Sequence, residues 1–207
     1  MNSSTLIDKI AGNLNRSDAT RALVLDWLNN RMLQIENTEN FYLMESTFDA
    51  PTVVGQRTYS LPSNYKDELQ ITLVSGTTKF PLIKWVGSEA ENSFANTTQQ
   101  AQPTNYWVWS GAYFLYPIPN AIYTLTLKCY LYLDKFTDTA AEENDLGVYW
   151  PDLMIYGATA EGFHYFMQAD KVAEWETKFQ NELQKLLRRD TKKRYSNYTP
   201  RMRLRIK

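Results

Sequence analysis

The first part of the chain has the hydrophobic spacing of helices. Apolar residues recur every three or four positions over residues 5–14, and the same spacing resumes after a polar break at residues 15–18. Ser17 or Asp18 is a suitable N-cap for this second segment, which continues to about Glu36. The pattern predicts two amphipathic helices at the N-terminal end.

The spacing then changes to a period of two, which is typical of β-strands. Residues 41–134 show this period, most clearly in the run 122–133, where Leu, Cys and Tyr alternate with Thr, Lys and Tyr. Two aromatic-rich runs joined by a Ser-Gly turn predict a hairpin over residues 106–116. The polar residues 88–103 predict a long exposed loop.

Helical spacing returns in the last third of the chain. Pro151 fits the first turn of one helix, and an apolar stripe predicts another helix over residues 171–189. The fold class predicted is therefore α+β, with N- and C-terminal helices forming a bundle and a mainly antiparallel β domain inserted between them. The domains expected are a helical bundle over 1–40 and 145–190, a β insertion over 41–144, and an extended basic arm over 191–207.

The charge is distributed very unevenly along the chain. From Lys185 to Lys207 there are ten Lys or Arg residues and one acid, Asp190, which gives +9. The remaining residues hold 12 Lys or Arg and 22 Asp or Glu, which gives −10. A basic terminal segment on an acidic body is typical of a region that binds a partner.

The end of this arm alternates basic and apolar residues over 201–206, so a strand would place arginines on one face and Met, Leu and Ile on the other. Three interpretations remain open: a solvated tail, an arm that grips nucleic acid, and an arm that docks on a protein, which the alternation favours. The partner-binding residues predicted are Arg188, Arg189, Lys192, Lys193, Arg194, Tyr195, Tyr198, Arg201, Met202, Arg203, Leu204, Arg205 and Ile206.

No constellation in the sequence predicts catalysis, a metal site or a cofactor. His164 is the only histidine and has only Glu161 as a nearby acid, so we interpret it as a structural residue. Cys129 falls on the apolar face of a predicted strand and should be a core residue with a raised thiol pKa. The acidic residues 142–145 lack the alternating oxygens and glycine of a calcium loop.

Composition narrows the protein class further. One cysteine excludes an intrachain disulfide framework, the N-terminus lacks the pattern of a signal peptide, and no apolar run approaches ~18 residues, so no membrane span is expected. The aromatic fraction of 14% is high and favours contact surfaces as well as a core. Because no catalytic motif is present either, the sequence gives no reason to propose an enzyme.

The chain resembles a known family over most of its length, through its N-terminal helices and five short motifs that follow them: the head-to-tail connector (adaptor) proteins of tailed phages, particularly short-tailed ones. The motifs are Tyr59-Ser60-Leu61-Pro62 before a strand, Pro103-Thr104-Asn105-Tyr106 before the hairpin with Tyr116-Pro117-Ile118-Pro119 after it, Tyr149-Trp150-Pro151-Asp152 at a helix start, and Trp175-Glu176-Thr177-Lys178-Phe179 in the last helix.

The resemblance implies a structural virion protein in the neck between head and tail, assembled in the host cytoplasm. It implies a ring, typically of twelve copies, that docks under the portal protein, helps to close the DNA-filled head and provides the platform for the tail. The partners implied are the portal, neighbouring copies, and downstream tail or nozzle and fibre proteins, with packaged DNA nearby. The alternative function is DNA binding through the basic arm.

Overall fold

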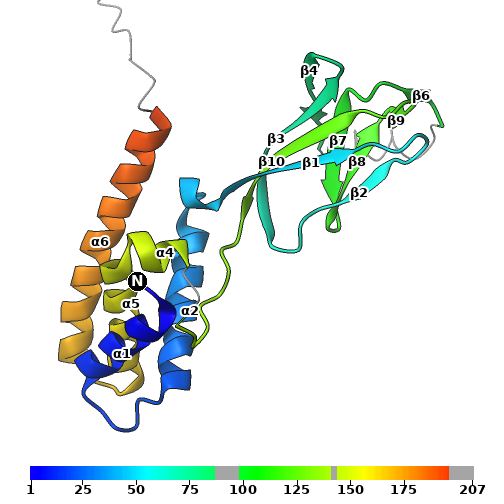
Figure 1. Cartoon of the computed structure of the whole chain (residues 1–207). Helices are drawn as coiled ribbons and strands as arrows, with labels where there is room; N and C mark the ends of the chain where they lie inside the picture. Colours follow the sequence, from blue (N-terminus) through cyan, green and yellow to red (C-terminus); the bar gives the residue numbers. More distant parts are fainter. Residues whose placement is uncertain (87–97, 141–143, 196–207) are drawn as a thin grey trace, which may run out of the picture. The chain divides into compact units, whose positions relative to one another are not determined.

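The chain is an α+β protein that divides into two compact units. A computed structural model describes residues 1–86, 98–140 and 144–195 (Figure 1). The helical unit comprises residues 1–43 and 133–207, and the β unit comprises residues 44–132. The fold class predicted from the sequence is confirmed at the level of mixed helices and antiparallel sheets.

The helical unit contains the N- and C-terminal segments of the chain. Its elements are α1 (Ser3–Leu14), α2 (Arg21–Thr38), the 3₁₀ turn η1 (Tyr42–Met44), whose last residue belongs to the β unit, α4 (Asp145–Tyr149), α5 (Pro151–Tyr165) and α6 (Ala169–Tyr195). The N-cap of α2 is Thr20, whose side chain accepts a hydrogen bond from the Leu23 amide. The prediction of Ser17 or Asp18 as this cap was wrong, because Asp18 instead pairs with Arg16 and the turn before α2 extends to Thr20.

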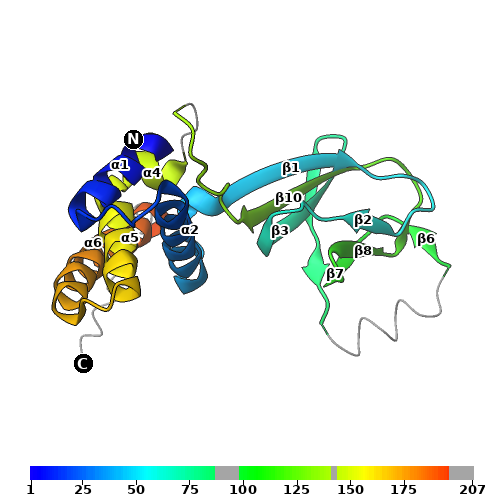
Figure 2. The same cartoon turned by 90° about the horizontal axis from the view of Figure 1, so that it is seen from below.

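Helix α5 is the centre of the helical unit. It contacts α1, α2, α4 and α6, and Figure 2 shows it between α2 and α6. Residues on all its sides are buried, which is typical of a helix enclosed by others. Two glycines permit the close approach: a Cβ on Gly157 would lie 2.9 Å from Phe179, and one on Gly162 would lie 2.8 Å from both Leu14 methyl carbons.

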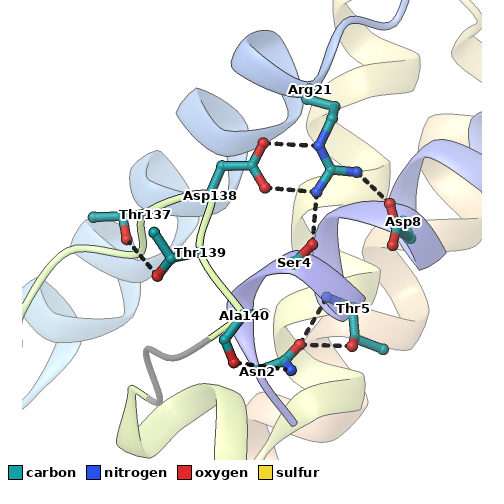
Figure 3. Close-up of polar contacts among 9 residues, drawn as sticks. All are labelled: Asn2, Ser4, Thr5, Asp8, Arg21, Thr137, Asp138, Thr139 and Ala140. Atoms are coloured by element: carbon teal, nitrogen blue, oxygen red, sulfur yellow. Dashed lines mark hydrogen bonds and ion pairs between the residues drawn. The ribbon is translucent and has the colours of Figure 1, made fainter.

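An ion-pair network fastens α1, α2 and the segment before α4. Arg21 binds both carboxylate oxygens of Asp138, at 2.7 and 2.5 Å, and also contacts Asp8 and Ser4 (Figure 3). These bonds lower the pKa of Asp138 and raise that of Arg21. The side chain of Asn29 exchanges two hydrogen bonds with the backbone of buried Phe136.

These contacts explain why residues 133–140 belong to the helical unit rather than to the β unit, where the sequence analysis placed them. The backbone of this segment pairs with polar side chains of α2: besides Asn29, the buried carboxylate of Glu36 accepts from the Leu133 amide at 2.6 Å. Hydrogen bonds from side chains to the backbone do not produce a hydrophobic periodicity, so the sequence pattern could not predict them.

In its described residues, the β unit contains two four-stranded sheets and a short strand pair. The strands are β1 (Glu45–Pro51), β2 (Thr58–Ser60), β3 (Tyr65–Ser75), β4 (Thr78–Pro81), β5 (Ile83–Lys84), β6 (Gln100–Ala101), β7 (Asn105–Trp109), β8 (Ala112–Tyr116), β9 (Ile118–Pro119) and β10 (Thr124–Leu131). One sheet has the order β1-β10-β3-β4, the other β2-β8-β7-β5, and β6 pairs with β9. The core lies between the two larger sheets.

The predicted hairpin is confirmed as β7 and β8, joined at Ser110 and Gly111, which both have positive φ. The long predicted strand is β10, and its apolar face is buried as expected at Leu125, Leu127 and Cys129. Tyr130 was placed on the opposite face, yet it is also buried. The register of β10 against β3 shifts on both sides of this residue, and such bulges reorient side chains.

Replacing Gly162 by Ala should destabilise the fold by ~1–3 kcal/mol, because the added methyl group overpacks Leu14 and Trp27. Chemical denaturation measures this loss. Gly12→Ala is the matched control: nothing lies within 4 Å of a Cβ there, so this helical substitution should be neutral or stabilising. Equal effects of the two substitutions would contradict the packing described for α5.

The Arg21–Asp138 contact should make stability depend on pH. Because the folded-state pKa of Asp138 is lowered, its stabilisation is present above about pH 4, the ordinary range of an aspartate, and is lost as the pH falls through the folded-state pKa. Asp138→Asn should therefore lower the denaturation midpoint near neutral pH. The difference from the wild type should shrink at about pH 3. A difference independent of pH would count against this contact.

Candidate partner-binding surface

The C-terminal half of α6 carries the described part of the basic segment. Its inner face packs on the helical unit through Phe179, Leu183 and Leu186, all buried. Lys185, Arg188, Arg189 and Lys192 follow at spacings of three, one and three residues and are all exposed. This spacing places the four cations on one side of the helix, away from its buried face. We call these four residues the basic stripe.

The end of α6 is anchored by the single acid of the basic segment. Asp190 is only 2% exposed and accepts a hydrogen bond from the Tyr42 amide at 2.7 Å. Its other oxygen lies 2.7 Å from Nε of Arg194. The ammonium group of Lys193 lies 3.5 Å from the centre of the Tyr42 ring, within the range of a cation–π contact. The basic stripe is therefore held on a helix whose end is fixed to the body.

These anchors extend α6 beyond its predicted end. The sequence analysis ended this helix at Arg189 and began the extended arm at residue 191, whereas the structure has helix to Tyr195. The ion pair of Arg194 with Asp190, four residues apart, stabilises the added turn. For residues 191–195 the prediction of extended structure was wrong.

The predicted partner-binding residues thus fall into four groups. Arg188, Arg189 and Lys192 belong to the basic stripe, and the Arg189 guanidinium also lies 5.5 Å from the centre of the Trp150 ring. Lys193 contacts the Tyr42 ring, and Arg194 pairs with Asp190 on the same helix. Tyr195 ends the helix. The rest lie outside the described residues: Tyr198, Arg201, Met202, Arg203, Leu204, Arg205 and Ile206.

Sequence reasoning missed the role of Asp190. It counted this residue only as the lone acid among ten cations. The usable sign was its position, since Asp190 follows Leu183 and Leu186 by seven and four residues and so continues the apolar stripe. A charged residue on a buried face needs a partner, which the Tyr42 amide and Arg194 supply here.

The candidate chemical residues remain apart. His164 is exposed. Glu161 instead pairs with Arg31, whose Nε atom lies 3.0 Å from the Glu161 carboxylate. The Arg31 guanidinium also lies 2.9 Å from Glu176. Burial raises the pKa of the Cys129 thiol, as expected for a core cysteine. Within the described ranges, no three His, Cys, Asp or Glu side chains gather as metal ligands would. Of the predicted acidic cluster, Glu142 and Glu143 lie outside those ranges.

A groove at the turn between α5 and α6 offers little polar recognition. It has a volume of about 550 Å³ and is lined mainly by Met167, Val172 and nearby alanines. Of its polar residues, Glu176 is already paired with Arg31.

Among the described helices, none combines the length and the apolar character needed to cross a membrane.

The exposed basic stripe is a surface of the kind that contacts other macromolecules. A comparison with protein families agrees with this: the SU10 adaptor protein model matches residues 1–205. The chain therefore belongs to the SU10 adaptor protein family, which is a family of phage structural adaptors. A comparison with curated proteins gives no match.

This membership confirms the resemblance to phage adaptor proteins, while the link to short-tailed phages stays a prediction. It supports the expectation of a virion protein that acts at the neck and contacts portal and tail proteins. The family is one of structural adaptors and is not known for enzymes.

Removing the Asp190 carboxylate should detach the end of α6. Asp190→Ala should cost ~1–3 kcal/mol, because the partly buried Tyr42 amide loses its acceptor and Arg194 loses its counter-ion. Lys192→Ala, on the exposed face, should change stability by less than ~0.5 kcal/mol. Denaturant unfolding gives both values, and hydrogen exchange of residues 186–195 should rise only in the first variant. Unchanged exchange there would contradict the anchor.

Proposed function

We propose that this protein is a ring-forming head-to-tail adaptor. It docks under the portal as a ring of twelve copies, helps to close the DNA-filled head and presents the platform to which tail, nozzle or fibre proteins attach. Membership of a phage adaptor family supports the proposal. The observation that carries it is the basic stripe, which an anchored helix holds toward solvent in a fixed geometry.

The charge distribution suits a heterologous contact, in which one face of a copy meets a different face of the next partner. The segment 185–207 carries +9, whereas the rest of the helical unit is acidic, with seven Lys or Arg and 16 Asp or Glu. Opposite charges on separate surfaces favour head-to-tail association and steer encounter. Arg189, which is exposed and lies beside Trp150, forms with it a pair of residue types that are common at the centres of interfaces.

The stripe also supports a second candidate function, a grip on DNA phosphates by Lys185, Arg188, Arg189 and Lys192. The adaptor proposal expects weak, non-specific DNA binding. The alternative expects an affinity for duplex DNA that falls steeply as salt rises, with a slope set by the number of phosphates contacted. Titration of the full chain with duplex DNA at several salt concentrations distinguishes the two functions.

Charge reversal on the stripe should impair attachment to filled heads. Arg188→Glu with Lys192→Glu should reduce co-sedimentation with DNA-filled, tail-less heads by tenfold or more, and a tenfold loss corresponds to ~1.4 kcal/mol. Both side chains are exposed, so the fold should persist. Lys9→Glu with Lys135→Glu changes the net charge equally at other exposed positions and is the matched control. Equal attachment by both variants would exclude the stripe as a docking surface.

A further inference from the structure

The edges of the two larger sheets differ greatly in length. Over the described part of the chain these edges are β1, β4, β2 and β5, with seven, four, three and two residues. None of the described strands pairs with the outer side of β1. A long edge of this kind presents unpaired backbone groups that can pair with another extended chain.

The two faces of β1 differ in chemistry. Glu45, Thr47 and Asp49 are exposed and share the polar face of the sheet. Phe48 lies on the other face, where it pairs with the core residue Leu127, yet it remains 38% exposed. The edge therefore has acidic groups four residues apart on one face and an incompletely covered aromatic ring on the other.

The segment 201–206 has the complementary pattern. As a strand it would carry Arg201, Arg203 and Arg205 on one face and three apolar residues on the other. The two acids of β1 and the outer two arginines have the same spacing of four residues. When Arg203 lies opposite Thr47, the two outer arginines therefore lie opposite Glu45 and Asp49. This holds whether the strands run parallel or antiparallel. The apolar side chains of the segment then lie on the same face of the sheet as Phe48.

We propose that segment 201–206 of one copy adds as a strand to the outer edge of β1 in a neighbouring copy. Backbone bonds would supply affinity, while the arginine and apolar faces set the register. The five residues 196–200 form a spacer that spans roughly 17 Å when extended. The proposal rests on the self-association proposed above and names two different surfaces that would join consecutive copies of a ring.

Disulfide trapping tests this pairing in the full chain. Thr47→Cys and Arg203→Cys are made in separate proteins, which are then mixed, so that only pairing between copies yields a mixed disulfide. Neighbouring strands provide the Cα separation that a disulfide requires. Thr78→Cys, exposed on the opposite edge β4 of the same sheet, is the matched control for Thr47→Cys. We expect the mixed disulfide with Thr47→Cys and at most traces with Thr78→Cys.

Charge exchange then separates specific pairing from chance collision. Arg201→Glu with Arg205→Glu, in the Arg203→Cys protein, should lower the yield of mixed disulfide about tenfold. Adding Glu45→Arg and Asp49→Arg to the Thr47→Cys protein should restore it. Equal trapping at β1 and β4, no rescue, or a bridge only within single chains of a Thr47→Cys/Arg203→Cys protein would overturn the proposal.

The failure of this proposal is distinguishable from that of the proposed function. If the wild-type protein forms rings that bind the portal but trapping at β1 fails, only the strand pairing is wrong. If the wild-type protein neither self-associates nor binds the portal, both proposals fail.

Discussion

The enclosure of α5 is the constraint on which the helical unit depends. A helix buried on all sides needs neighbours at close range, and Gly157 and Gly162 allow α6 and α1 to reach it. Because α6 is pressed onto α5 through Phe179, its opposite side must face solvent, and the basic stripe occupies that side. Arg31 on α2 joins three helices, because it forms ion pairs with Glu161 on α5 and Glu176 on α6. The position of the candidate surface therefore follows from the packing of a core helix.

Anchoring the end of α6 has a consequence for binding. A charged helix that is already fixed loses less conformational entropy on association than a free tail does. Asp190 provides this preorganisation at the cost of burying a carboxylate, which is stable only because the Tyr42 amide and Arg194 pair with it. Asp190 thus fixes the helix that carries the cations. In an adaptor, such a rigid surface suits repeated docking of identical copies.

Hydrophobic periodicity was sufficient to predict the mixed fold, the β7–β8 hairpin and the buried face of β10, because these features depend on burial of alternating or helically spaced side chains. Periodicity could not predict features that polar contacts determine. The N-cap at Thr20, the attachment of residues 133–140 to α2 and the helical residues 191–195 all depend on particular side chain to backbone bonds or ion pairs. Tyr130 was misplaced because register shifts interrupt the period of two. The candidate surface was predictable from charge, but the separation of the basic stripe from the anchoring cations Lys193 and Arg194 was not.

The central claim is that this protein forms a ring between portal and tail. Electron microscopy of the purified full chain mixed with the portal protein of its phage tests this claim most directly. The account predicts an additional closed layer on the tail-facing side of the portal, composed of repeated copies of this protein. It also predicts that the α6 stripe of each copy lies at a contact with the portal or with a neighbouring copy. A portal without added density, or with single copies bound at scattered positions, would contradict the account.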